Sequence, residues 1–174
     1  MKRIVIIFMS LIGLVLALTG CGEVESAPKT SVNTILDVSQ YSRITTEELV
    51  SKLGDPISKD EWNYESPNGQ SYATTSYNYE IDGYQVEFLV IENAVVRLNS
   101  YTSDNPDNKF EINEQKDVLS LVGITPRESL IVVEENPSVA RYSSVSDVVG
   151  EVFALLDEKI VTEIKITYNL NYFN

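Results

Sequence analysis

A helical turn that ends in glycine occurs twice in the chain, and this repetition constrains the fold more than any other feature. Residues 49–54 (Leu-Val-Ser-Lys-Leu-Gly) match residues 118–123 (Val-Leu-Ser-Leu-Val-Gly) at an offset of 69. The residues that follow match at an offset of 65, which aligns Tyr77 with Tyr142. Recurrence at a fixed period of this size indicates duplicated supersecondary units. We therefore expect an α+β fold of two tandem repeats, each a short helix followed by a three- to four-stranded antiparallel β-meander.

The first helix has signals at both of its ends. Thr45 and Glu48 form a capping box, in which each side chain accepts a hydrogen bond from the other residue's backbone N–H. Gly54 follows the last apolar residue of the pattern and is placed to end the helix in the left-handed αL conformation, which has positive φ. These residues predict a helix over Thr46–Leu53, with positive φ at Gly54 and, from the repeat, at Gly123.

The segments after each helix alternate between polar and apolar residues as strands do. Asp82-Gly83 is a two-residue hairpin signal, because glycine permits the positive φ that such a turn needs. Residues 147–158 also fit a helical face, but the interior Gly150 and the β-branched content favour a strand. The predicted strands are residues 61–65, 72–81, 84–91, 94–102 and 160–168.

The start of the chain has the pattern of an export signal. Lys2 and Arg3 precede an uninterrupted run of 15 apolar and small residues, residues 4–18. This run is shorter than a bilayer requires and has the length of the apolar region of a signal peptide. An uncleaved anchor and an ordinary signal peptide with a bystander cysteine are the alternative interpretations.

The residues Leu18, Thr19, Gly20 and Cys21 resemble the lipobox of bacterial lipoproteins, and Cys21 is the only cysteine of the chain. The resemblance implies that the signal peptidase recognises Leu18, Thr19 and Gly20. It also implies that the thiol of Cys21 carries a diacylglyceryl group and that cleavage leaves Cys21 as the mature N-terminus. The protein would then be extracytoplasmic and held by the lipid on Cys21 to the cell membrane of a Gram-positive bacterium, or alternatively to an outer membrane.

These patterns divide the chain into five expected segments. Residues 22–33 lack any helical or strand period and read as a spacer, whereas residues 35–41 have the apolar content to pack on the body. The segments are a lipoprotein signal peptide (1–20), a lipidated N-terminus with a flexible tether (21–40), a first helix-plus-sheet repeat (41–103), a linker (104–112) and a second helix-plus-sheet repeat (113–174).

The composition argues against catalysis, metal binding and nucleic-acid binding. The formal net charge is −13, whereas nucleic-acid binding requires a basic face. Histidine is absent, which removes the commonest general base and the commonest transition-metal ligand. No activated nucleophile or phosphate-binding loop is visible in the sequence. We expect no enzyme activity, no catalytic residues, no metal site and no cofactor.

A stretch of the first half resembles a known binding unit. Residues 45–56 (Thr-Thr-Glu-Glu-Leu-Val-Ser-Lys-Leu-Gly-Asp-Pro), with the strand residues 62–64 and 86–98, are similar to the helix-plus-sheet unit of SmpA/OmlA-type lipoproteins and of β-lactamase-inhibitory-protein-like domains. Members of these families have no catalytic residues and work as binding or scaffolding modules, often through a sheet face. The resemblance extends over roughly residues 45–170, and because the inhibitory protein carries the unit in tandem, it implies a tandem architecture here. It also implies a lipoprotein that binds another protein, and it implies nothing about β-lactamase itself.

Aromatic residues are concentrated in the first half of the chain. Large, stiff and amphipathic side chains of this kind are favoured at binding surfaces, and they are also ordinary strand residues. The expected partner is a protein; a cell-wall glycan or small envelope ligand, and a phage- or plasmid-encoded surface-exclusion role, are the alternatives. The face periods place Trp62, Tyr77 and Tyr79 in the core and leave Tyr72, Tyr84 and Tyr101 as the candidate binding surface.

Overall fold

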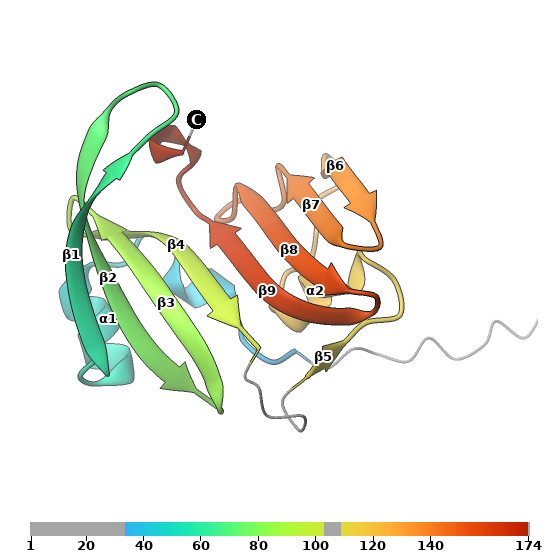
Figure 1. Cartoon of the computed structure of the whole chain (residues 1–174), viewed down its shortest axis with the longest axis horizontal. Coiled ribbons are helices and arrows are strands. Elements are labelled where there is room, and N and C mark those ends of the chain that lie inside the picture. The colour runs from blue at the N-terminus through green and yellow to red at the C-terminus, as the bar shows by residue number, and fades with distance from the viewer. Residues whose placement is uncertain (1–33, 103–108, 174) are drawn as a thin grey trace, which may run out of the picture. The chain divides into compact units, whose positions relative to one another are not determined.

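The computed structural model describes residues 34–102 and 109–173 (Figure 1). The predicted signal peptide, the lipobox residues Leu18, Thr19 and Gly20, and the lipidated Cys21 lie outside the described residues. The helices are η1 (Val38–Tyr41), α1 (Thr46–Leu53), α2 (Asp117–Leu121) and η3 (Leu170–Tyr172), where η marks a 3₁₀ helix. The strands are β1 (Ser58–Glu65), β2 (Ser71–Ile81), β3 (Tyr84–Ile91), β4 (Ala94–Tyr101), β5 (Phe110–Glu111), β6 (Ile131–Asn136), β7 (Val139–Ser143), β8 (Glu151–Asp157) and β9 (Ile160–Thr167).

All of these strands belong to one antiparallel sheet. The strand order is β1-β2-β3-β4-β9-β8-β7-β6. The short strand β5 pairs with residues 160–161 at the start of β9 (Figure 1). Within the described residues, β1 and β6 are therefore the two edges of a nine-stranded sheet.

The prediction of two tandem helix-plus-meander repeats is wrong. Residues 97–101 of β4 pair with residues 163–167 of β9, so strands from both halves of the chain form one continuous sheet. The second helix, α2, has only five residues. Two separate meanders would each expose an unpaired edge at their last strand, and the pairing of β4 with β9 removes both of these edges. Such pairing is non-local, so the alternation within each half of the sequence carries no signal for it.

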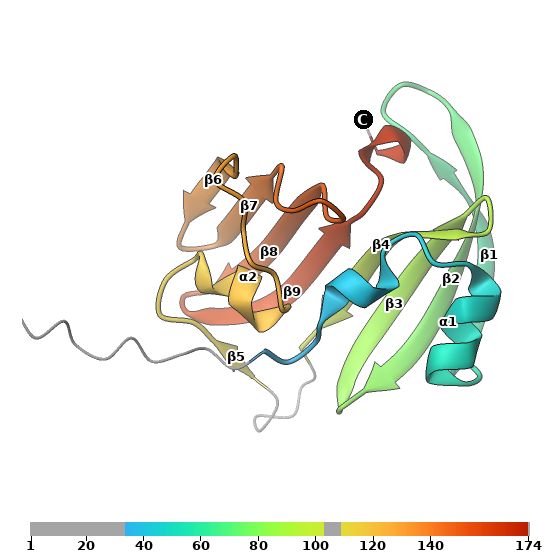
Figure 2. The same cartoon turned by 180° about the vertical axis from the view of Figure 1, so that it is seen from behind.

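Both α-helices pack on the same face of the sheet, which we call the covered face (Figure 2). Leu49 of α1 and Leu119 of α2 are almost completely buried there, and they belong to one core with the sheet residues Phe88 and Ile166. Burial of this apolar surface is the main stabilising contribution to the fold.

The local predictions of the capping box, the positive-φ glycines and the hairpin turn are confirmed. Thr45 Oγ1 accepts from the Glu48 N–H at 3.2 Å, and Glu48 Oε2 accepts from the Thr45 N–H at 2.8 Å. Gly54 and Gly123 both have positive φ, +79° and +71°, but Gly54 has ψ −161°, so the expectation that it ends the first helix in the αL conformation is wrong. In addition, Asp82-Gly83 forms the two-residue turn between β2 and β3, with positive φ at both residues.

The segment before the first helix also packs on the covered face. We call residues 34–41 the N-terminal strap. The Ile35 N–H donates to the Leu121 carbonyl at 2.8 Å, and the Val38 N–H donates to the Val122 carbonyl at 3.2 Å. The packing predicted for residues 35–41 is therefore present, and the described part of the predicted tether, residues 34–40, lies against the body.

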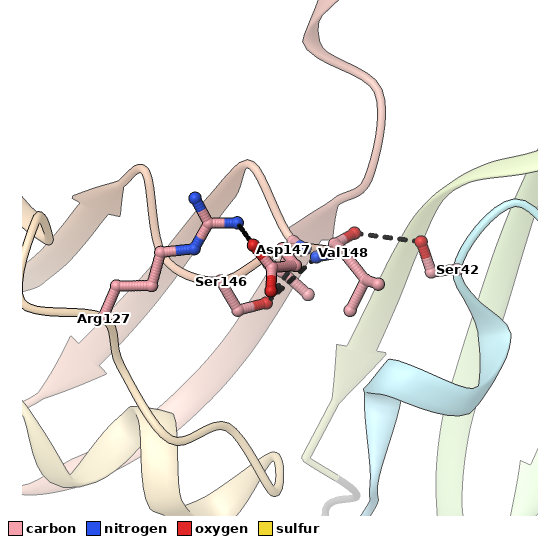
Figure 3. Close-up of polar contacts among 6 residues, drawn as sticks. Ser42, Arg127, Ser146, Asp147 and Val148 are labelled. Carbon is pink, nitrogen blue, oxygen red and sulfur yellow. Dashed lines mark hydrogen bonds and ion pairs between the residues drawn. The ribbon is translucent and has the colours of Figure 1, made fainter.

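A loop between β7 and β8 replaces the tight turn that joins β2 to β3. Ser146 Oγ accepts from the Val149 N–H at 3.1 Å, and Asp147 forms an ion pair with Arg127 (Figure 3). Ser42 Oγ, directly after the strap, donates to the Val148 carbonyl at 2.9 Å (Figure 3). The loop is thus held from both halves of the chain, and the strand predicted after it is confirmed as β8.

Candidate functional site

The sheet face opposite the α-helices is the candidate binding surface, and we call it the open face. Directly paired residues of an antiparallel sheet lie on the same face, so the pairing register shows which side chains meet there. One complete row crosses the sheet from β2 to β6 and combines amide, acidic, basic and aromatic side chains. This central row consists of Asn78, Glu87, Asn99, Lys165, Phe153, Arg141 and Glu134.

The middle of the open face is a network of polar side chains around Glu87. Asn99 Nδ2 donates to Glu87 Oε2 at 2.8 Å, and the Tyr101 hydroxyl lies 3.5 Å from the same oxygen. Burial, together with the negative charges of Glu87 and Glu163, raises the pKa of Tyr101 to about 12. The Tyr101 hydroxyl is therefore protonated at neutral pH and acts as a hydrogen-bond donor.

A depression of about 260 Å³ lies beside this network. Asn78, Glu80, Gln85, Glu87 and Tyr101 form its polar lining. Asn99 is 6% exposed, and its Oδ1 atom has no hydrogen-bond partner among the described residues. The arrangement offers several acceptors and few free donors, so it suits contact with donor groups of another molecule.

Ion pairs continue the polar surface over the second half of the sheet. Arg141 donates to Glu151 Oε2 through Nε at 3.0 Å and through an Nη atom at 2.8 Å. Lys165 Nζ lies 3.0 Å from Glu163 Oε1 and 5.6 Å from the centre of the Phe153 ring. Aromatic residues and arginine are enriched at protein–protein interfaces, whereas lysine and the acidic residues are depleted there.

The C-terminal segment covers the other end of the open face. The Phe173 ring lies 3.5 Å from the Arg97 guanidinium carbon and 5.1 Å from the Tyr64 ring. Tyr172 packs edge-on against Tyr72 with the ring centres 4.9 Å apart. Burial lowers the pKa of Arg97 from its ordinary value, but an arginine stays charged at neutral pH. These contacts enclose Arg97 in an aromatic cluster instead of presenting it to solvent.

The three tyrosines predicted as a binding surface do not lie together. Tyr101 lies on the open face and lines the depression. Tyr72 lies on the same face, but Tyr172 covers it. Tyr84 points to the covered face, where its ring lies 4.4 Å from Phe110 beside an apolar cavity of about 10 Å³. All three side chains are half-buried.

The core prediction holds for two of the three aromatic residues to which it was applied. Tyr77 and Tyr79 are 8% and 5% exposed, as expected. Trp62, however, is 41% exposed, and its Nε1 donates to Ser76 Oγ at 3.0 Å. Trp62 pairs with Thr74, so it lies on the open face, opposite to Tyr77. The alternation of side chains along one strand does not show the register in which that strand pairs with its neighbour, so it could not place Trp62 relative to Tyr77.

The apolar side chains of β6 were not among the residues that the sequence predicted as a binding surface. Ile131, Val132 and Val133 form an ordinary apolar run in the sequence, and only the strand order reveals that they lie on a sheet edge. They are among the most exposed large apolar side chains of the described residues.

The described part of the chain contains no group of three or more acidic, histidine or cysteine side chains placed to hold a metal ion. Nor does any helix within residues 34–102 and 109–173 have the length and apolar content needed to cross a membrane.

Two of the solved structures that are similar to this chain come from secreted or extracellular bacterial proteins. One is a cysteine-rich secretory protein from Staphylococcus aureus, at 10% identity and a TM-score of 0.44, over 80% of this chain and 49% of that one. The other is an extracellular protein containing a SCP domain from Bacillus anthracis, at 15% identity and a TM-score of 0.42, over 82% of this chain and 48% of that one. This chain thus spans about half the length of each. Likeness at this level carries no argument about function. No protein-family model and no curated protein matches the chain.

Proposed function

We propose that this protein is a lipid-anchored, extracytoplasmic and non-catalytic module of the bacterial cell envelope that binds another protein through the open face of its sheet. The anchor is the lipid on Cys21, and the localisation follows from the export pattern and the lipobox. The resemblance of residues 45–56 to SmpA/OmlA-type lipoproteins points to the same class of function.

The observation that carries the proposal is the contrast between the two faces of the sheet. Helices and the strap bury one face in the core, whereas the other carries the central row and the depression beside Tyr101. Paired charges and half-buried aromatic rings give such a surface both orientation and contact area in a protein complex.

A photo-crosslinking residue placed on each side of the sheet tests the binding surface. Gln85 lies on the open face, and Lys52 lies on α1 over the covered face; both are exposed, so substitution at either leaves the core intact. In intact cells we expect Gln85→benzoylphenylalanine to give a discrete adduct that Lys52→benzoylphenylalanine does not give. The same adducts from both positions, or none from position 85, would contradict the proposal.

Metabolic labelling with a fatty acid tests the anchor separately. Cys21→Ser removes the thiol that the lipid requires, so the variant should incorporate no label and should stay at the size of the precursor. Normal maturation and membrane retention of this variant would contradict the lipoprotein assignment.

A second candidate function is the binding of a cell-wall glycan, and the exposure of Trp62 favours it. Trp62 borders a depression of about 330 Å³ lined by Glu61, Asn63, Thr74 and Thr75 as well. An exposed indole beside polar side chains is a platform on which a sugar ring can stack. Trp62 is the only tryptophan of the chain, so its fluorescence reports on this site alone. Titration with soluble peptidoglycan fragments should shift the emission if the site binds them, and an unchanged spectrum at saturating fragment would exclude it.

A further inference from the structure

The two edges of the sheet differ in what they expose. Edge strand β1 carries the charged residues Lys59, Asp60, Glu61 and Glu65. Charged side chains are a common means by which proteins keep an edge strand from pairing with another chain. Edge strand β6 instead exposes three consecutive apolar side chains, Ile131, Val132 and Val133, which are 53%, 52% and 48% exposed.

One side of β6 has no strand beside it. β6 pairs with β7 on its other side, and no strand of the described residues pairs with its outer side. The outward backbone N–H and C=O groups of such an edge can form the hydrogen bonds of an added strand. The apolar side chains would then be shielded from water by the side chains of the added strand.

We propose that the occupant of this edge is β6 of a second copy of the chain, paired antiparallel with Val132 opposite Val132. This register places Ile131 of each copy opposite Val133 of the other, so the apolar side chains meet. Glu134 and Glu135 of each copy then extend past the apolar residues toward Leu130 and Ser129 of the other, which precede β6, so no like charges lie directly opposite each other. The sequence of β6 is thus complementary to itself about Val132, as a two-fold symmetric interface requires.

The symmetry of this pairing also suits two chains held to one membrane. An antiparallel strand pair that extends a sheet has its two-fold axis perpendicular to that sheet, so both covered faces lie on the same side. The described chain begins on that side, because Thr34 Oγ1 donates to the Ser120 carbonyl of α2 at 3.0 Å. Both N-terminal straps therefore start on one side of the dimer, and both open faces lie side by side on the other. The fit of this symmetry to two chains on one membrane rests on the proposed anchor, whereas the register does not.

Two features limit the strength of the pairing. β6 makes a bulge against β7 between Val132 and Glu134, which restricts regular pairing to a short stretch around Val132. The formal net charge is −13 for the whole chain and −13 − 2 = −15 once residues 1–20, which contain Lys2 and Arg3, are removed; this charge on each copy opposes association at low ionic strength. We therefore expect a concentration-dependent dimer that added salt strengthens, the reverse of what a basic partner strand in this place would show.

Cysteine crosslinking of the full-length chain in its membrane tests the register. Directly opposite residues of an antiparallel pair have Cα atoms close enough for a disulfide. Val132→Cys should give at least tenfold more disulfide-linked dimer under mild oxidation than the parent chain, whose only cysteine is Cys21. Asp60→Cys on the charged edge β1 is the matched control and should resemble the parent chain. Ile131→Cys should crosslink to Val133→Cys when the two variants are co-expressed.

A second measurement needs no added cysteine. Sedimentation of the detergent-purified full-length chain should show a dimer that Val132→Lys converts to a monomer, with the melting temperature of the fold unchanged because Val132 is half exposed. Equal crosslinking at positions 132 and 60, or a dimer that survives Val132→Lys, would overturn the proposal. A parent chain that stays monomeric at high salt would also overturn it. None of these results bears on the open face, which the crosslinker at position 85 tests independently.

Discussion

The two α-helices follow similar sequence patterns, but they are stabilised in different ways. α1 has eight residues and a complete capping box, and Leu49 is its only fully buried residue. α2 has five residues and no side-chain hydrogen bond from its N-cap residue Lys116, yet it buries Val118, Leu119 and Leu121. Isolated helices this short are marginal in water, so each needs help. α1 obtains much of it from its own capping box. α2 has a local contact at its start, where Asp117 Oδ2 accepts from the Asn113 and Glu114 N–H groups at 3.0 Å each, but its C-terminal end depends on segments that are remote in the chain.

The C-terminal end of α2 shows where this help comes from. The Ile124 N–H donates to the Leu119 carbonyl at 2.8 Å, and the Gly123 N–H donates to the Ser120 carbonyl at 3.1 Å. These two bonds form a Schellman motif around Gly123. The strap satisfies two further carbonyls of this end, those of Leu121 and Val122. Carbonyl groups at a helix end have no partner within the helix, so the strap completes α2.

The largest effect is expected from a side chain at Gly123, where the strap lies against the end of α2. A Cβ atom there would lie 3.1 Å from Asp37 Cα and 3.2 Å from Thr34 Cγ2, and φ is +71°. Backbone strain of about 1–2 kcal/mol would add to overpacking of about 1–3 kcal/mol. We expect Gly123→Ala to lower the free energy of unfolding by about 3–4 kcal/mol in urea denaturation of the purified chain.

Gly54→Ala is the matched change at the end of α1, and we expect it to cost about 2 kcal/mol. A Cβ atom at Gly54 would meet no atom within 4 Å, so only the backbone strain remains. Gly54 has φ +79° and ψ −161°, a region that only glycine adopts readily, rather than the left-handed helical region in which many helices end. Equal losses from the two variants would show that the strap moves aside at Gly123 and that α2 does not depend on it.

This contrast explains which parts of the fold the sequence could predict. α1 and the Asp82-Gly83 turn depend on residues a few positions apart, and both formed as predicted. The pairing of β4 with β9 joins residues more than sixty positions apart and has no local signal. The same pairing decides that the chain has one sheet and not two repeats.

The candidate site follows the same division. The sequence shows which residues of a single strand share a face, but it does not show how β1 is aligned with β2. Trp62 was therefore predicted on the same face as Tyr77, whereas it lies on the opposite face. The covering of Tyr72 by Tyr172 joins residues 100 positions apart. The edge position of β6 is likewise a property of the strand order and not of residues 131–136.

A smaller effect is expected from the bond that joins the strap to the end of β9. The Tyr168 hydroxyl donates to the Val38 carbonyl at 2.7 Å, and Tyr168 is 2% exposed. Burial raises the pKa of Tyr168 well above its ordinary value, so the hydroxyl keeps its proton and donates throughout the neutral range. Tyr168→Phe leaves a buried carbonyl without this partner and should cost about 1–2 kcal/mol in the same urea experiment.

Tyr142→Phe is the control for this loss. The Tyr142 hydroxyl donates to Glu135 Oε1 at 2.5 Å, and Glu135 is exposed, so water can replace the lost donor. A loss for Tyr142→Phe as large as that for Tyr168→Phe would show that the strap contact has no special part in stability.

The smallest effect is expected at the start of the two helices, where the contribution of the N-cap side chain to the free energy of unfolding can be measured alone. Thr45→Ala removes the acceptor of the Glu48 N–H and should cost about 1 kcal/mol. Thr45→Ser keeps an acceptor hydroxyl and should recover most of this loss. Lys116→Ala at the start of α2 should leave the free energy of unfolding unchanged, because the Lys116 side chain makes no capping hydrogen bond. If Lys116→Ala were as costly as Thr45→Ala, the start of α2 would also depend on its N-cap side chain. The difference between the helices would then lie only in the strap at the C-terminal end of α2.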